Sequence, residues 1–239
     1  MPPRQELIHL GGLQKSSLID YPGKISCVFF LPGCNFDCPY CHNPDLVRGS
    51  LSCHTCPDEK TVYEFLERRK EFLDGVVISG GEPTLDRDLI PLCEKVKKLG
   101  YPLKLDTNGS QPKVIEQLIH KGLVDYIAMD IKTDPFSYSP LIIRDYDPSH
   151  ILASIQIVME TAKEYEFRTT CARPIVNEYT IENIARTVKG ASLYVLQRFR
   201  PGRVLHPEYF QKNQGGYDED GLMHLRSIAK PWIRECIIR

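Results

Sequence analysis

Short apolar segments that alternate with helical patterns are the feature that most limits how this chain can fold. The apolar segments span residues 25–30, 76–79, 103–105, 126–129, 167–171 and 193–196. Hydrophobic repeats typical of amphipathic helices occupy residues 61–73, 88–99, 113–120, 151–164 and 181–189. Strands that are apolar almost throughout and alternate with helices favour a parallel sheet covered by helices. Six such units are fewer than the eight of a closed barrel, so we predict an α/β fold, a partial (β/α)6 barrel with parallel strands.

The length of the chain limits its domain organisation. At 239 residues it suits one well-buried domain. We expect a single domain over residues 1–239, with a barrel core at about 24–200 and a C-terminal extension at about 201–239 that contains a helix over 218–229. Residues 133–150 hold three prolines and should form a long irregular loop, either a lid or docking surface or a plain connection.

The composition argues against two classes of partner. Lys and Arg number 30 against 31 Asp and Glu, so no general basic field would attract nucleic acid. No apolar run approaches the roughly 20 residues that cross a bilayer, and residues 1–6 are too polar for a signal peptide. Nine cysteines without an export signal favour a reducing compartment and metal or redox chemistry. We therefore expect a cytoplasmic protein without a nucleic-acid or membrane partner.

Three of the cysteines lie close together in residues 32–43, here called the cysteine loop. Cys34, Cys38 and Cys41 have C-x3-C-x2-C spacing, and the next cysteine is Cys53. Electron-transfer 4Fe–4S clusters are held by four cysteines, so a loop with three predicts a cluster with one iron open to another ligand. Buried or zinc-binding cysteines are the alternative. Zinc loops favour paired C-x2-C knuckles with partners further along, which makes the cluster the better interpretation.

Glycine-rich and charged motifs follow most of the predicted strands. They are residues 80–83 (GGEP), 106–109 (DTNG), 130–132 (DIK) and 197–199 (QRF), and the cysteine loop follows the first strand. Parallel strands in α/β barrels place their carboxyl ends on one face, where active sites are built. The sequence therefore predicts that these motifs converge on one site with the three cysteines.

The cysteine loop resembles the signature of the radical S-adenosylmethionine (radical SAM) enzymes. The later motifs, with residues 17–23 (SLIDYPG), 168–171 (RTTC) and 194–197 (YVLQ), resemble in order and spacing those of glycyl-radical-enzyme activases. Within that family the likeness is closest to the activating proteins of anaerobic ribonucleoside-triphosphate reductases. The resemblance extends from about residue 11 to about residue 202.

The resemblance implies two cofactors and the residues that bind them. A 4Fe–4S cluster held by Cys34, Cys38 and Cys41 takes the amino and carboxylate groups of SAM at its open iron. One electron, from a flavodoxin- or ferredoxin-type donor, cleaves SAM to methionine and a 5′-deoxyadenosyl radical. That radical takes a hydrogen atom from a glycine of a partner glycyl radical enzyme, here an anaerobic ribonucleotide reductase. The residues expected to bind SAM are Tyr40, Gly80, Gly81, Glu82, Pro83, Asp106, Asn108, Asp130, Lys132, Arg168 and Gln197.

The motifs after the second and third strands have roles that suit their residue types. Gly80 and Gly81 allow the backbone to approach a ligand. Glu82 offers acceptors to the methionine ammonium group, and Asp106 is a second acceptor near it. Thr107 and Asn108 either hydrogen-bond the ligand or shape the turn.

The remaining candidates each have a structural alternative. Tyr40 packs its ring against the adenine or simply fills the core. Lys132 supplies the positive charge that a bound carboxylate needs, and Asp130 either lies beside the cofactor or pairs with Lys132. Arg168 faces the cofactor inside the barrel or makes an outward salt bridge, and Gln197 stands where the family has a ribose contact.

Several residues do not fit one clear role. Cys53 and Cys56 form a lone C-x2-C that binds an additional metal with distant or partner ligands, forms a redox pair, or is inert. Asp20 resembles the aspartate that borders the substrate-peptide groove of activases, or it forms a turn before the first strand. The other cysteines lie in apolar settings and are expected in the core: Cys27, Cys93, Cys171 and Cys236.

Three functions are compatible with these patterns. The first is an activase, an oxidoreductase that acts on a glycine of a partner protein. The second is a radical SAM enzyme that acts on a small molecule, similar to 7-carboxy-7-deazaguanine synthase. The third is a non-enzymatic iron–sulfur or zinc protein. We favour the activase, because no additional substrate-binding domain is visible and residues 20–23 match the activase pattern.

Overall fold

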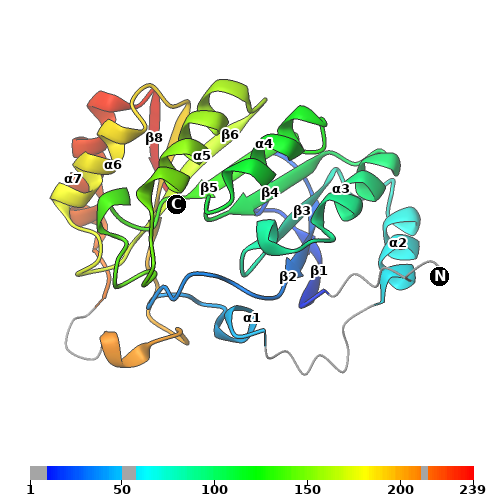
Figure 1. Ribbon diagram of the computed structural model, residues 1–239, viewed down its shortest axis with the longest axis horizontal. Coiled ribbons are helices and arrows are strands. Elements are labelled where there is room, and N and C mark those ends of the chain that lie inside the picture. The colour runs from blue at the N-terminus through cyan, green and yellow to red at the C-terminus, as the bar shows by residue number, and fades with distance from the viewer. Residues whose placement is uncertain (1–9, 50–57, 211–214) are drawn as a thin grey trace.

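The computed structural model describes residues 10–49, 58–210 and 215–239. Within these ranges eight strands form one sheet in the order β1-β2-β3-β4-β5-β6-β7-β8. Adjacent strands are parallel from β2 to β8, and β1 is antiparallel to β2. The sheet curves into an open, partial barrel (Figure 1). The strands are β1 (Gly12–Ser17), β2 (Ser26–Leu31), β3 (Gly75–Gly80), β4 (Leu103–Thr107), β5 (Tyr126–Asp130), β6 (Tyr165–Cys171), β7 (Leu193–Arg198) and β8 (Glu235–Ile238).

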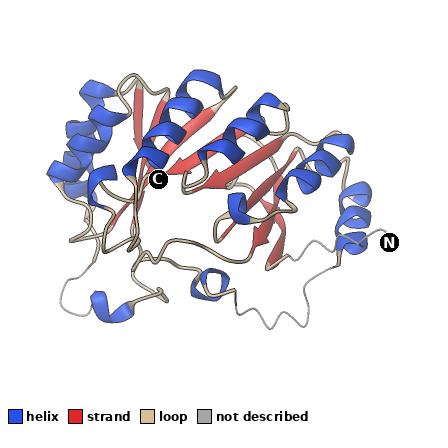
Figure 2. Ribbon diagram, in the orientation of Figure 1, coloured by secondary structure: helices blue, strands red, loops and turns tan. Residues whose placement is uncertain are grey.

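Helices pack along the outer face of the curved sheet, whereas the short α1 (Pro44–Val47) lies beyond the strand ends (Figure 2). None of the helices in the described ranges combines the length and apolarity that crossing a bilayer requires. The outer helices are α2 (Glu59–Arg68), α3 (Leu89–Lys98), α4 (Pro112–His120), α5 (Pro148–Thr161), α6 (Glu178–Thr187) and α7 (Glu219–Ala229).

The predicted partial barrel is confirmed, and its six strands correspond to β2–β7. The sheet has two further edge strands that the prediction misses. The sequence of β1, GLQKSS, is polar and half exposed, so a search for apolar runs does not find it. The other, β8, has only four residues, ECII. The helix expected over 218–229 is α7, which begins after Asp218, whose side chain accepts a hydrogen bond from the backbone of Gly221.

The loop expected over residues 133–150 is shorter than predicted, because α5 begins at Pro148. Asp147 caps this helix by accepting a hydrogen bond from the Ser149 backbone. The rest of the loop packs against the cysteine loop. The ring of Tyr138 meets that of Phe36 edge-on, with centroids 5.7 Å apart.

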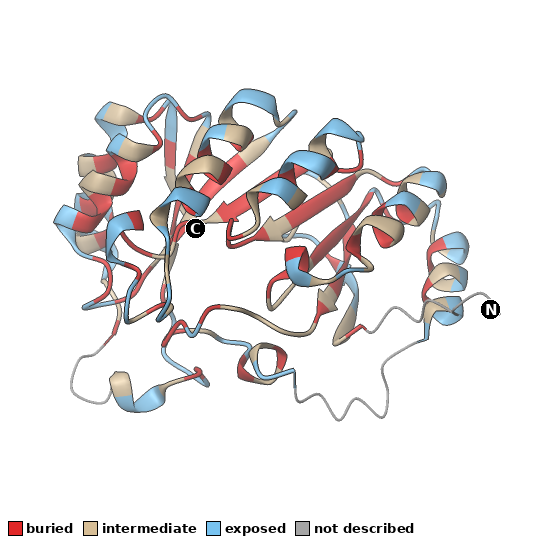
Figure 3. Ribbon diagram, in the orientation of Figure 1, coloured by how far each residue is buried: buried red, intermediate tan, exposed pale blue. Residues whose placement is uncertain are grey.

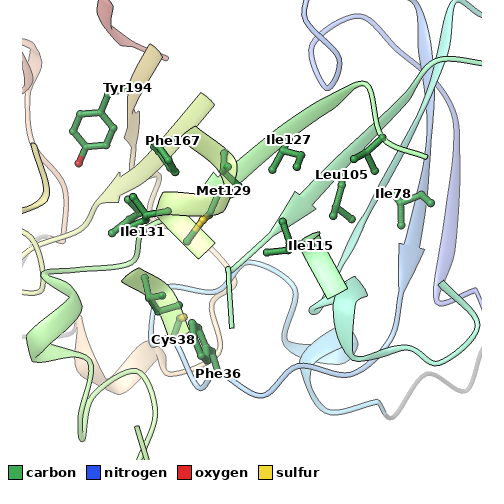
Figure 4. Close-up of a cluster of buried hydrophobic side chains, with 14 of the residues drawn as sticks. Phe36, Cys38, Ile78, Leu105, Ile115, Ile127, Met129, Ile131, Phe167 and Tyr194 are labelled. Atoms are coloured by element: carbon green, nitrogen blue, oxygen red, sulfur yellow. The ribbon is translucent and has the colours of Figure 1, made fainter. Parts of the chain in front are cut away.

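The hydrophobic core lies between the sheet and the outer helices. Successive residues of a strand point to opposite faces, so Ile78, Leu105 and Ile127 all face the helices and are buried. Figure 4 shows these side chains in a row along the sheet, with Phe36 and Cys38 of the cysteine loop beyond its end. Figure 3 shows the strands mostly buried and the outward sides of the helices exposed. The core thus fixes the platform on which the cysteine loop rests.

The opposite, concave face of the sheet carries charged residues. The strand register pairs Lys104 with Tyr126 and Asp130 with Arg168. Because alternate residues share a face, Asp106 and Glu166 lie on this inner face too. Lys104 and Glu166 are buried there beside the apolar Val28, Val77 and Ala128, so charged and apolar side chains together fill the inside of the curve below the strand ends.

The assignment of the core predicts the effect of shortening a buried leucine. Leu105→Ala should lower the free energy of unfolding by about 2–5 kcal/mol, because the change leaves a cavity between the sheet and the helices. Leu18→Ala is the matched control, since its side chain is 76% exposed, and the free energy of unfolding should stay within about 0.5 kcal/mol. Urea unfolding followed by circular dichroism measures both, and equal effects would contradict the assigned core.

Candidate functional site

A cavity of about 200 Å³ lies between the cysteine loop and the carboxyl ends of β3, β4, β5 and β6. The three cysteines of the predicted cluster line it together. Predicted SAM-binding residues also line it: Tyr40, Gly80, Gly81, Asp106, Asn108, Asp130, Lys132 and Arg168. Glu82, Pro83 and Gln197 are not among the lining residues.

Sequence reasoning missed part of the cavity wall. Thr170 lies two residues after Arg168 in β6, so strand alternation alone would have placed it on the same face. Ser79 immediately precedes the two glycines at the end of β3. Phe36 and Val47 are apolar and gave no signal of a site. Thr107, whose role the sequence left open, also lines the cavity. The lining residues that were not predicted to bind a cofactor are Phe36, His42, Asn43, Val47, Ser79 and Thr170.

The three cysteines form a donor set suited to an iron–sulfur cluster. Cys38 is buried, and Cys34 and Cys41 are partly buried. Burial raises the pKa of the Cys34 thiol to about 11 and that of Cys38 to about 12, so a bound metal must displace their protons. Among the described residues, no three His, Cys, Asp or Glu side chains converge as the ligands of a single metal ion. Cysteines that each bind a different iron of one cluster need no such convergence.

Gly80, the last residue of β3, and Gly81 after it allow the chain that leads into the cysteine loop to approach closely. The backbone nitrogen of Gly81 donates to Leu31 O at 2.9 Å, and that of Glu82 donates to Gly33 O at 2.8 Å. A Cβ atom at Gly80 would lie 2.2 Å from Leu31 O, and one at Gly81 would lie 2.0 Å from Gly33 O. The described contacts therefore explain Gly80 by backbone packing against the end of β2 and Gly81 by backbone packing against the cysteine loop.

Two other segments hold the cysteine loop from different sides. Ile142, in the loop after β5, accepts a hydrogen bond from Asp37 N at 2.8 Å. In the segment after β7, Leu205 N donates to Cys41 O at 2.9 Å and His206 N donates to Pro39 O at 3.1 Å. Figure 1 shows these segments meeting beyond the strand ends. The loop is thus bound to the scaffold at both of its ends and in its middle.

The structure corrects the expected role of the Glu82 side chain. Its carboxylate is only 1% exposed and accepts hydrogen bonds from Thr84 N at 3.0 Å, Thr107 Oγ1 at 2.8 Å and Asn108 N at 2.5 Å. Burial raises the pKa of Glu82, while the hydrogen bonds from Thr84, Asn108 and Thr107 act in the opposite direction. Instead of facing a ligand ammonium group, the carboxylate joins the loop after β3 to the loop after β4.

Charged side chains from three strands form a network at the cavity wall. Asp130 accepts from Arg168 Nε at 2.7 Å and from Lys132 Nζ at 3.1 Å. Asp106 pairs with Lys104, and its Oδ1 lies 3.4 Å from Arg168 Nη1. The predicted pairing of Asp130 with Lys132 is therefore present, and both residues also line the cavity. Arg168 faces the inside of the barrel, as one of its alternatives predicted.

The network fixes the charges of its members. Burial by itself would raise the pKa of Asp130, but the Arg168 and Lys132 cations lower it below its usual range. Burial would likewise lower the pKa of Lys132, but Asp130 raises it above its usual value. Both groups are therefore ionised at neutral pH. The cavity wall therefore presents the Lys132 ammonium group and the Asp130 carboxylate to a zwitterionic ligand.

Tyr40 and the DTNG turn each have defined hydrogen bonds at the cavity. Tyr40 is buried, and its hydroxyl donates to Lys132 O at 3.3 Å while its ring lines the cavity. Thr107 Oγ1 donates to Glu82 and accepts from Gly109 N at 3.1 Å. Thr107 therefore shapes the turn.

Other sequence features lie away from the cavity. Asp20 is in the turn before β2, at the end of that strand opposite the cysteine loop, where its carboxylate accepts from Ser17 Oγ. The turn-forming alternative for Asp20 is thus present. Cys53 and Cys56 lie outside the described residues. The four cysteines expected in the core are buried, as predicted: Cys27, Cys93, Cys171 and Cys236.

Comparison with known proteins agrees with this geometry. The model of the radical SAM superfamily matches residues 28–190. A protein of Methanocaldococcus jannaschii named as a glycyl-radical enzyme activating enzyme is 38% identical over 235 residues, which cover 96% of this chain and 95% of that protein. A 7-carboxy-7-deazaguanine synthase of Thermococcus kodakarensis is 26% identical over 197 residues, covering 72% of this chain and 73% of that protein. The crystal structure of QueE from Escherichia coli shares the fold, with a TM-score of 0.58 at 14% identity over 98% of this chain and 95% of that one.

The position of Glu82 predicts a stability effect. Glu82→Ala should lower the free energy of unfolding by about 1–3 kcal/mol, because it leaves buried donors of the DTNG turn without an acceptor. Glu67→Ala removes a carboxylate from the exposed side of α2 and should change that free energy by less than about 0.5 kcal/mol. Urea unfolding measures both. If Glu82→Ala left the stability unchanged but weakened SAM binding, the carboxylate would instead contact SAM directly.

The position of Lys132 predicts an effect on SAM binding. Lys132→Met should weaken the affinity roughly ten- to hundredfold, because a charge-assisted contact contributes about 1.5–3 kcal/mol. Lys132→Arg keeps the positive charge and should retain most of the affinity. Calorimetric titration of the reconstituted variants with SAM measures the difference. If Lys132→Met bound SAM as wild type with its iron intact, Lys132 would serve only as the partner of Asp130.

Proposed function

Because the chain belongs to the radical SAM superfamily, we propose that it is an activating enzyme for a glycyl radical enzyme. The observation that carries this proposal is the cavity in which Cys34, Cys38 and Cys41 face a wall of fixed charges. The likeness over nearly full length to a protein named as such an activating enzyme supports the choice of reaction.

In this proposal the residues of the cavity bind and orient two cofactors. Cys34, Cys38 and Cys41 hold a 4Fe–4S cluster, which supplies one electron when reduced. That electron cleaves a carbon–sulfur bond of SAM to give methionine and a 5′-deoxyadenosyl radical. Lys132 holds the carboxylate of SAM by its charge, and Tyr40 presents its ring to the adenine. The radical then takes one hydrogen atom from a glycine Cα, which leaves 5′-deoxyadenosine and a glycyl radical.

The shape of the partial barrel supports a polypeptide substrate. Lys104, Tyr126 and Glu166 are buried on the inner face and fill the barrel below the cavity. Strands β1 and β8 lie at opposite ends of the sheet order and do not pair with each other, so the barrel is open at its side. A loop of a partner protein can enter there and supply a wall that shields the radical from water.

The partner in our proposal is an anaerobic ribonucleotide reductase, and the electron donor is a flavodoxin- or ferredoxin-type protein. The likeness of residues 17–23 to the activase pattern supports a glycyl radical enzyme as the partner. A cluster with an open iron needs a reducing environment, and nine cysteines are consistent with one. We therefore place the reaction in an anaerobic cytoplasm.

A second candidate is a radical SAM enzyme that acts on a small molecule. The likeness over 72% of this chain to a protein named 7-carboxy-7-deazaguanine synthase favours it. Such an enzyme must close its own site around the substrate, whereas an activase uses its partner to do so.

The two candidates differ in where the radical ends. Mixed anaerobically with SAM, a reductant and an anaerobic ribonucleotide reductase, the reconstituted protein should generate a glycine-centred doublet in electron paramagnetic resonance. Replacing the radical-bearing glycine of the reductase by alanine should remove the doublet. Cys41→Ala should remove the doublet too, because the two remaining cysteines cannot hold a cluster that has one open iron. Turnover of a purine-like small molecule, with no radical on any tested glycyl radical enzyme, would favour the second candidate.

A further inference from the structure

The side chain of Asn108 has one defined orientation. Its Oδ1 accepts a hydrogen bond from Ser110 N at 2.9 Å. A backbone N–H can only donate, so the carbonyl end of the amide must face Ser110 and the NH2 end must face the other way. The Asn108 backbone is fixed as well, because its N–H donates to the buried carboxylate of Glu82 at 2.5 Å.

The NH2 end of Asn108 points at the cysteine loop. Nδ2 donates to Asn35 Oδ1 at 3.0 Å and lies 3.9 Å from Cys34 Sγ, within hydrogen-bonding range of a sulfur acceptor. Asn35 Oδ1 also accepts from Ser110 Oγ at 3.3 Å. The Asn108 amide therefore donates one proton to Asn35 Oδ1 and the other to Cys34 Sγ.

Cys34 differs from the other two cluster cysteines in this respect. Its sulfur accepts from Phe36 N at 3.4 Å and from Asn108 Nδ2. In the described part of the chain, no hydrogen bond reaches the sulfur of Cys38 or Cys41. Among the described residues, Asn108 is thus the one whose side chain donates to a predicted cluster ligand. It lies in the turn directly after β4 and not in the cysteine loop.

We propose that Asn108 is a positioning residue that donates a hydrogen bond to Cys34 Sγ and thereby raises the reduction potential of the cluster that this loop binds. The inference rests on the cluster of the proposed function but not on the identity of its substrate. The reduced cluster carries one more negative charge than the oxidised one. A donor to the thiolate stabilises the reduced state more strongly, and hydrogen bonds to sulfur are an established control of such potentials.

This role differs from the two that the sequence left open for Asn108. A residue that only shapes its turn would need the Ser110 bond but no contact with Cys34. A SAM ligand would leave its NH2 group free for the cofactor, whereas both amide protons already have acceptors on the cysteine loop.

The test is the midpoint potential of the reconstituted cluster, measured by anaerobic redox titration with electron paramagnetic resonance. Asn108→Ala should shift the potential to a more negative value at unchanged iron and sulfide content. Asn108→Leu fills the volume of the amide without its donor and should give a shift of the same sign, so it carries the test if the alanine variant loads no cluster. The SAM affinity of either variant should stay within about threefold, since loss of a direct contact to the cofactor would cost roughly tenfold.

Asn35→Ala is the matched control, because it removes the neighbouring acceptor but leaves Asn108 anchored by Ser110 and Glu82. Its potential should stay near that of wild type. An unchanged potential in a cluster-loaded Asn108 variant would overturn the inference. An equal shift of the midpoint potential in Asn35→Ala would also overturn it, because the effect would then come from the position of the cysteine loop. Failure of the wild-type protein to assemble any 4Fe–4S cluster would instead refute the proposed function.

Discussion

The buried carboxylate of Glu82 is the contact on which the geometry of the site depends. It joins the loop after β3 to the DTNG turn after β4 through Thr107 and Asn108. The backbone of the same residue holds the cysteine loop through Gly33 O. A buried carboxylate is stable only when donors satisfy it, and here the donors come from the turns that carry functional groups. One residue thus sets the spacing between the cysteines and the sheet.

The inner face of the sheet explains why this site suits a zwitterionic ligand. Arg168 lies between Asp106 and Asp130, and the latter also binds Lys132. Arg239, which follows β8, pairs with the buried carboxylate of Glu166 at 3.1 Å. Opposite charges that alternate across neighbouring strands attract one another, which offsets part of the cost of burying them. The ligand meets charges that are already oriented, which lowers the cost of binding.

Sequence patterns predicted the central strands and the convergence of the GGEP, DTNG and DIK motifs with the cysteine loop, whereas residues 197–199, which were expected there too, do not line the cavity. Apolar runs mark β2–β7, and turn motifs at strand ends must meet on one face of a parallel sheet. The polar β1 and the four-residue β8 follow no such pattern. The same limit applies to the site: Glu82 and Asn108 were recognised as functional, but their partners depend on tertiary contacts. Residue type gives the chemistry of a side chain, and only the fold decides which way it points.

The attachment of the cysteine loop has a consequence for how the site works. Backbone hydrogen bonds reach the loop from the end of β3, from the loop after β5 and from the segment after β7, at Gly33, Asp37, Pro39 and Cys41. A loop held at so many points keeps its thiols in place before any metal binds, so little conformational entropy remains to be lost on assembly. These bonds join the loop after β2 to the segment after β7, although the edge strands β1 and β8 do not pair with each other. The scaffold can therefore hold the cysteines rigidly without closing the sheet into a full barrel.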